Sequence, residues 1–286
     1  MTWQTVFRWD MQSVRRSRLG QGVAATLVTL TGGVALLVAL AVFSSPPEVE
    51  PPEFDQIMLV IGYVASFILP FVAMLASYST IIHERERGSV RFLLGLPNSR
   101  TEAYVGKYLS RSVLLVVPLV VGLLVAGAIG FGLLQNPDGA ALAQAVLVTV
   151  VYGLIFLGFG LTISAVFDTE TRVTSALIGV YVLFRAGWMI AQWGALRILL
   201  PRGERFARPH PEWYYWLGRV NPMNAYNKLI HGLLGNPDTG SPLLTTPARE
   251  VSTVATSDAF AAVVLVVWVV VAPLLGYLRF RNRDIL

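Results

Sequence analysis

Few residues of this 286-residue chain have the types and spacing needed to bind a nucleotide or break a bond. The phosphate-binding loop Gly-x-x-x-x-Gly-Lys-Ser/Thr holds phosphates with its backbone amides and its lysine. Gly106-Lys107 is a fragment of that pattern, but Tyr108 follows the lysine and the upstream glycine is missing. No His-Glu-x-x-His pattern occurs either. We therefore predict no catalytic residue, no cofactor and no hydrolysis of ATP by this chain.

We next consider copper binding, because imidazole and thioether groups both bind copper. The candidate ligands are His210, Met223 and His231. Their spacing defines no coordination geometry, and scattered His and Met residues more often have structural roles. The chain contains no cysteine, so disulfides and thiolate metal sites are excluded. We expect no metal site.

One charged residue, Arg185, lies inside an apolar run of the sequence. A charge at the centre of a bilayer costs at least ~2.5 kcal/mol, so Arg185 is a candidate for an intramembrane functional residue. The alternative is that Arg185 lies near a helix end and extends to the lipid head groups. Trp188 and Trp193 are typical of such an interface, and they favour this alternative.

Composition predicts the elements that carry these residues. Hydrophobic residues make up 55% of the chain and charged residues 14%, whereas a soluble domain has about 25% charged residues. So little charge fits an outer surface that faces lipid. Six apolar runs are long enough to cross a bilayer as helices. We predict an all-α, polytopic membrane protein with transmembrane helices at about residues 22–43, 57–82, 112–134, 140–167, 173–191 and 259–278.

The basic residues predict the orientation of these helices. Fourteen Lys and Arg residues lie before the first run, in the loops at 83–111 and 168–172, and in the tail, whereas the loops at 44–56 and 135–139 have none. Loops rich in Lys and Arg stay in the cytoplasm, so both termini are predicted there and the protein in a plasma membrane. The extracytoplasmic loop at 192–257 has seven basic residues, but long loops are largely exempt from this rule. The net charge of +5 therefore indicates contact with membrane lipid, not nucleic acid.

The segment between the second and third runs is the most informative one for function. Charged residues occupy positions 84–87, and the apolar residues Val90, Leu93 and Leu94 follow before Pro97. Spacings of three and four place these apolar side chains on one face of a short helix. Proline ends such a helix. The residue pattern alone favours a helix on the membrane surface; a helix that binds another protein is the alternative.

This segment contains the motif Glu84-x-x-x-Gly-Ser-Val-x-x-Leu-Leu-x-x-Pro97-x-x-Arg100, which continues to Gly106-Lys107. The motif resembles the first cytoplasmic loop of the ABC-2 type transporter permeases. The tail Phe280-Arg-Asn-Arg-Asp-Ile and the element Asn221-Pro222 are similar to that family too, and the resemblance covers the whole chain in span count and loop lengths. Within the family, the chain looks most like permeases of nitrous-oxide-reductase maturation transporters. That likeness also includes Phe67-Ile-Leu-Pro70 and Tyr226.

The resemblance implies one transmembrane permease domain, residues 1–286, that moves a substrate as a dimer with itself or with a related permease. It also implies two soluble ATP-binding cassette subunits, which hydrolyse the ATP. A cytoplasmic amphipathic coupling helix would lie in a cleft of that subunit, its apolar residues in a groove and its charged residues at the rim. The residues implied in this coupling are Glu84, Arg85, Glu86, Gly88, Val90, Arg91, Leu93, Leu94, Pro97 and Arg100.

Two alternatives remain: a non-transporting membrane anchor or sensor component, and a secondary transporter. The scarcity of ionisable residues within the apolar runs and the absence of an internal repeat disfavour a secondary transporter. The loop at 192–257 contains the aromatic cluster Trp213-Tyr-Tyr-Trp216. Such a cluster suggests an aromatic belt at the head groups or a short re-entrant helix over the translocation path. A ligand site in this loop is the less favoured interpretation.

Overall fold

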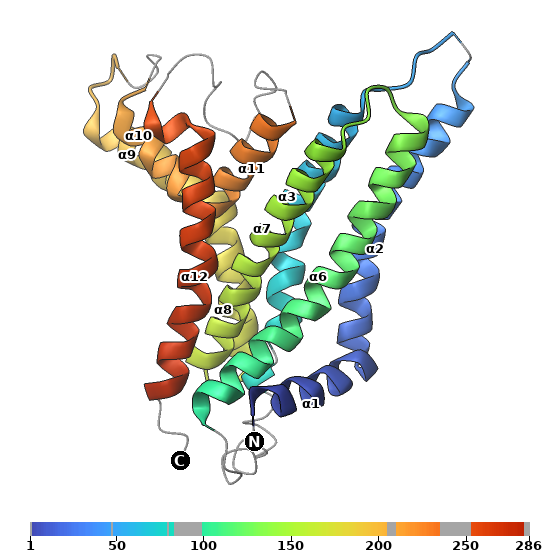
Figure 1. Ribbon diagram of the computed structural model, residues 1–286. Helices are drawn as coiled ribbons and strands as arrows, with labels where there is room; N and C mark the ends of the chain where they lie inside the picture. Colours follow the sequence, from blue (N-terminus) through green and yellow to red (C-terminus); the bar gives the residue numbers. More distant parts are fainter. Residues whose placement is uncertain are drawn as a thin grey trace.

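The computed structural model is helical throughout the parts of the chain that it describes (Figure 1). These parts are residues 2–46, 48–78, 80–82, 99–204, 210–234 and 253–282. The helices are α1 (Trp3–Arg16), α2 (Arg18–Ser44), α3 (Phe54–Ser77), α6 (Arg100–Leu133), α7 (Gly139–Val166), α8 (Glu170–Val182), the π-helix η1 (Leu183–Gly187), α9 (Trp188–Leu199), α10 (Glu212–Val220), α11 (Pro222–Leu233), the 3-10 turn η2 (Val254–Thr256) and α12 (Asp258–Asn282). The predicted all-α fold is confirmed.

Six segments of the described chain are long and apolar enough to cross a membrane. They are α2, α3 with its continuation to Ile82, α6, α7, the unbroken run of α8, η1 and α9, and α12. They lie side by side in one bundle (Figure 1). We call the end that holds α1, the start of α6 and the end of α12 the terminal end. The opposite end, which holds α9, α10 and α11, is the hairpin end.

Two of these segments extend beyond the apolar runs of the sequence. α6 begins at Arg100, twelve residues before the apolar run, because Ser99 and Glu102 form a capping box. The Glu102 backbone amide donates to Ser99 Oγ at 3.2 Å, and the Ser99 amide donates to the Glu102 carboxylate at 2.9 Å. The fifth segment continues past residue 191 to Leu199. Both extensions carry polar side chains, which hydropathy does not recognise as part of a spanning helix.

α7 is the central helix of the bundle and packs against α3, α6, α11 and α12. Of the most apolar stretch of α7, 67% is buried, against 17% of the fifth segment. Large apolar side chains on the outside of the bundle remain exposed, as expected of a surface that faces lipid. They include Leu36, Leu37, Phe43, Val117, Leu124, Leu147, Val182, Ile190, Val263 and Val270.

Two glycines of α7 allow neighbouring helices to approach closely. A Cβ atom at Gly160 would lie 2.5 Å from the Met74 carbonyl oxygen of α3, and one at Gly158 would lie 2.9 Å from the backbone nitrogen of Pro273 in α12. Both contacts are with backbone atoms, which cannot move aside. Small residues therefore pack α7 between α3 and α12, as they commonly do between membrane helices.

Candidate functional site

The predicted coupling residues lie almost entirely outside the described part of the chain. Glu84, Arg85, Glu86, Gly88, Val90, Arg91, Leu93, Leu94 and Pro97 all belong to the undescribed range 83–98. Arg100 is described, and it is the first residue of α6. Its Nη1 donates to the Arg281 carbonyl oxygen at 2.9 Å. The helix that follows the predicted coupling segment is thus joined to the last turn of α12.

α1 lies across the terminal end of the bundle and packs against α6 (Figure 1). Its buried face consists of Val6, Asp10 and Val14, which recur every four residues. Gly106 of α6 allows this contact, because a Cβ atom there would lie 2.8 Å from the Trp3 carbonyl oxygen. Asp10 is 4% exposed, so α1 places a carboxylate in the contact between two helices.

The carboxylate of Asp10 is paired with two residues of α6. Arg111 donates to it through Nε and Nη2, each at 3.2 Å, which is the bidentate geometry of a strong ion pair. Ser110 Oγ donates to the same carboxylate. Removing one partner of a buried ion pair costs about 3–5 kcal/mol, because the other charge is left uncompensated. This pairing therefore holds α1 on α6.

The same part of α6 also contacts the end of the second membrane segment. Arg111 Nη1 donates to the Ala76 carbonyl oxygen at 3.3 Å, and Lys107 Nζ donates to the Thr80 carbonyl oxygen at 3.2 Å. Asp10, Lys107, Ser110 and Arg111, which we call the terminal cluster, thus join α1, α3 and α6. The helices on both sides of residues 83–98 are fixed to one polar centre.

The terminal cluster was not among the residues predicted from the sequence, although the sequence contains a signal for it. Asp10 is the only acidic residue among the first twenty. Its spacing of four from Val6 and Val14 places it on the apolar face of the helix. A carboxylate on that face requires a buried partner.

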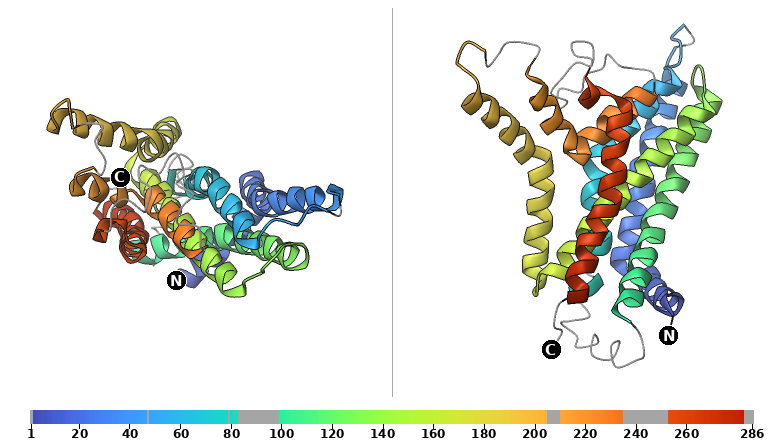
Figure 2. Two further views of the ribbon diagram at one scale, coloured as in Figure 1. Left: turned by 90° about the horizontal axis from the view of Figure 1, so that it is seen from above. Right: turned by 60° about the vertical axis from the view of Figure 1, so that its left-hand side comes forward.

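The second candidate site lies where the fifth segment bends. α8 rises from the terminal end, and α9 leans away from the bundle above η1 (Figure 2). In η1 the Trp188 amide donates to the Leu183 carbonyl oxygen, five residues earlier, as in a π-helix. The neighbouring Phe184 carbonyl oxygen accepts a hydrogen bond from Asn221 Nδ2 at 2.7 Å. The bend is therefore held by Asn221, a residue in the connection between α10 and α11.

α10 and α11 form a helical hairpin (Figure 2), and its tip, Asn221-Pro222, is buried. Asn221 Oδ1 accepts from the Met223 amide at 2.8 Å and so caps α11. Tyr226 of α11 stacks on Tyr152 of the central helix, with ring centroids 4.1 Å apart. The hairpin packs among α3, α7 and α12.

The last carbonyl groups of a helix such as α10 have no partner within their own helix, so they accept from other donors. Trp188 Nε1 donates to the Leu217 oxygen at 2.8 Å, and Trp268 Nε1 donates to the Val220 oxygen at 2.9 Å. Asn224 Nδ2 donates to the Gly218 oxygen at 2.9 Å. Indole and amide groups from three helices thus supply the donors for the last carbonyl groups of α10.

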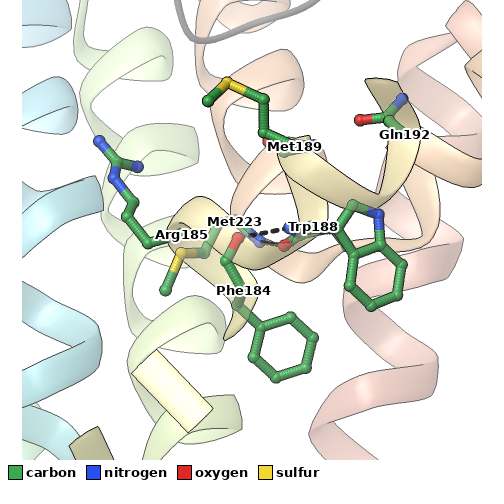
Figure 3. Close-up of a pocket in the computed structure, with 8 residues that line it drawn as sticks. Phe184, Arg185, Trp188, Met189, Gln192 and Met223 are labelled. Carbon is green, nitrogen blue, oxygen red and sulfur yellow. Dashed lines mark hydrogen bonds between the residues drawn. The ribbon is translucent and has the colours of Figure 1, made fainter. Parts of the chain in front are cut away.

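Arg185 is part of η1, halfway along the fifth segment. Its guanidinium carbon lies 3.2 Å from the centre of the Phe67 ring, which is in the middle of α3. A desolvated cation–π contact contributes about 2 kcal/mol, which offsets much of the cost of the charge. Its Nη2 is buried and has no hydrogen-bond partner in the described structure. The guanidinium therefore packs against α3 and points away from Trp188 and Gln192 (Figure 3).

The copper ligands considered from the sequence, His210, Met223 and His231, do not form one metal site. Met223 and His231 lie on one helix, eight residues apart, which corresponds to ~12 Å along its axis. His210 packs against the Tyr214 ring, with ring centroids 4.6 Å apart. Met223 and His231 are therefore too far apart to bind the same ion.

Comparison with known proteins gives matches along nearly the whole chain. Residues 4–285 match the ABC-2 family transporter protein. The probable ABC transporter permease protein NosY of Stutzerimonas stutzeri is 26% identical over 290 residues, which is 97% of each chain. NosY of Pseudomonas aeruginosa is 24% identical over 98% of each chain. The probable multidrug ABC transporter permease YbhR of Escherichia coli K12 is 29% identical over 178 residues, 62% of this chain and 44% of that protein.

Six segments of the described chain are long and apolar enough to cross a membrane, which defines a multi-pass membrane protein. The chain belongs to the ABC-2 family of transporter proteins. It is a permease subunit of an ABC transporter, and the ATPase of such a transporter is a separate subunit. The predicted family is thus confirmed, and an anchor or a secondary transporter is no longer needed to explain the sequence.

Proposed function

We propose that residues 84–97 bind the ATP-binding subunit on the cytoplasmic side, and that the terminal cluster carries the movement of this segment into the membrane. The observation that carries the proposal is the position of Arg111. It donates both to Asp10 of α1 and to the Ala76 carbonyl oxygen of α3, from the helix that follows the segment. A displacement of residues 83–98 would therefore move α1, α3 and α6 together.

In this proposal the terminal end lies in the cytoplasm and the hairpin end outside it. The support is the distribution of charge, since the predicted inner segments carry fourteen Lys and Arg residues, and their described parts lie at the terminal end. We also propose that the permease works as a dimer, with a second copy or a related permease beside it. The poorly buried fifth segment is the surface we assign to that contact.

Co-purification of the ATP-binding subunit tests the proposed docking. Leu93→Asp with Leu94→Asp would place two charges in an apolar groove, where each unpaired charge costs several kcal/mol. We expect the double variant to insert into the membrane normally and to lose the ATP-binding subunit. Asn136→Asp, in a short loop at the hairpin end, is the matched control and should retain it. If the double variant keeps its partner and normal ATP hydrolysis, the proposal is wrong.

A further inference from the structure

The corner between α1 and α2 carries three arginines, Arg15, Arg16 and Arg18, which we call the junction arginines. Arg15 and Arg16 end α1, and Arg18 begins α2. All three are exposed, and none forms an ion pair with an acidic side chain in the described part of the chain. Asp10, the only acidic residue among the first twenty, is buried and paired with Arg111. The exposed surface of α1 is therefore basic without a compensating acid.

Ser17 fixes the corner that presents these side chains. Its Oγ donates to the Val14 carbonyl oxygen at 2.8 Å and accepts from the Gly20 amide at 2.9 Å. Gly20 lies so close to Val14 that an added Cβ atom would collide with that carbonyl oxygen. The pairing of Asp10 with Arg111 holds the rest of α1 on α6. A rigid frame of this kind lowers the ordering cost of binding a ligand.

The length of α2 sets the depth of the corner in the membrane. Residues 22–43 contain no charged side chain. A helix of this length spans ~33 Å, which matches the hydrocarbon core of about 30 Å. Arg18 lies four residues before this run, or ~6 Å along the axis, whereas each head-group layer is about 5–8 Å thick. The junction arginines are therefore at the level of the phospholipid phosphates.

The rest of α1 lies at the same level. The helix runs across the terminal end of the bundle rather than along it, and at its outer edge (Figures 1 and 2). Trp9 is 55% exposed and lies seven residues before Arg16, on the same face of the helix. Tryptophan is enriched at the membrane–water interface, and a helix with basic and aromatic residues on its surface is typical of the head-group layer.

We propose that the junction arginines bind the phosphate groups of anionic phospholipids. Guanidinium groups match phosphate oxygens in geometry. Each basic residue at an anionic membrane surface strengthens the attraction about fivefold. A zwitterionic lipid carries a compensating cation and lacks this net attraction. The inference rests on the orientation given under the proposed function, because the cytoplasmic leaflet is the anionic one. Bound lipid holds α1 at the membrane surface, and Asp10 passes that restraint to α6.

Quenching by nitroxide lipids tests the proposal with two probes that differ in head-group charge. A single cysteine, Ser13→Cys, carries a nitrobenzoxadiazole label on the exposed surface of α1 of the cysteine-free chain. The permease is placed in phosphatidylcholine nanodiscs with a small fraction of phosphatidylglycerol or phosphatidylcholine that bears a doxyl group near the head group. We expect quenching by the anionic probe to indicate a local concentration about fivefold or more higher than that of the zwitterionic probe.

Two controls separate the corner from the rest of the molecule. The label at Ser44→Cys, at the opposite end of α2, should be quenched equally by both lipids. The triple variant R15Q/R16Q/R18Q should lose the preference for the anionic lipid. The variant R172Q/R197Q/R202Q removes the same number of exposed charges elsewhere and should keep it. In the unaltered chain, raising the salt shortens the range of the attraction and should weaken the preference.

Equal quenching by both lipids in the unaltered chain would overturn the proposal, as would a preference that survives the triple variant. Inorganic phosphate at constant ionic strength should leave the preference intact, because lipid in the same bilayer has a high effective concentration. If phosphate abolishes it, the corner binds free anions and the assignment to lipid is wrong. The assay contains no ATP-binding subunit, so its failure leaves the proposed docking standing, and failure of co-purification leaves the lipid result interpretable.

Discussion

Asn221 and Phe184 are joined by a 2.7 Å hydrogen bond from the Asn221 side-chain amide to the Phe184 carbonyl oxygen. One partner is at the tip of the α10–α11 hairpin and the other is in η1, the bend of the fifth segment. Asn221 is 1% exposed, so water cannot replace this bond. The position of the hairpin and the direction of α9 therefore depend on each other.

Asn221→Asp should separate the two roles of this side chain. An aspartate keeps an oxygen that caps α11, but it lacks the donor for the Phe184 carbonyl. Leaving that buried acceptor unpaired costs about 1–3 kcal/mol, and more with a carboxylate beside it. We expect a lower midpoint of thermal unfolding in detergent. Gln144→Ala, which removes an exposed amide on α7, is the control. An unchanged midpoint for Asn221→Asp would mean that the hairpin is held by packing alone.

If Asp10 and Arg111 form a buried ion pair, the single variants should lose stability and a double variant should recover most of it. Asp10→Ala or Arg111→Ala leaves one buried charge unpaired and should cost about 3–5 kcal/mol. Asp10→Leu with Arg111→Met removes both charges at similar volume and should recover most of that loss. Denaturant unfolding in detergent measures the effect, and proteolysis within α1 reports its detachment.

Arg8→Ala is the control for these variants, because Arg8 is an exposed charge of the same helix. It should change stability little, as is usual for surface charges. Additive losses in the double variant would contradict the assigned pairing, since two independent sites add their effects.

The fold could be predicted from the sequence because lipid imposes a simple rule on composition. Runs such as 140–167 contain no charged residue, and a single run of this length satisfies its own backbone groups in lipid as a helix. The longer extents of α6 and the fifth segment could not be predicted in the same way, because their polar ends depend on the Ser99 cap and on the hairpin rather than on hydropathy. Asn221-Pro222 was recognised as a motif, but its bond to Phe184 joins residues 37 positions apart. Pairings at that distance, like that of Asp10 with Arg111, follow from packing.

The orientation of the bundle is tested by thiol labelling, for which the cysteine-free chain gives no background. Single cysteines are introduced at Pro51 and at Ser89, and intact cells are treated with an impermeant maleimide. The positive-inside pattern predicts labelling at position 51 and none at position 89 until the cells are opened. Labelling of both positions in intact cells, or of position 89 alone, would refute the proposed orientation.

The central claim is that residues 84–97 contact the ATP-binding subunit, and a site-specific cross-link tests it most directly. A single cysteine at Leu94 is labelled with a benzophenone maleimide in membranes that contain both subunits, and a cysteine at Asn136 serves as the control. After illumination, we predict a covalent adduct of permease and ATP-binding subunit from position 94, with a yield that changes when ATP is added, and no adduct from position 136. No adduct from position 94, with an intact complex recovered from the same membranes, would contradict the account.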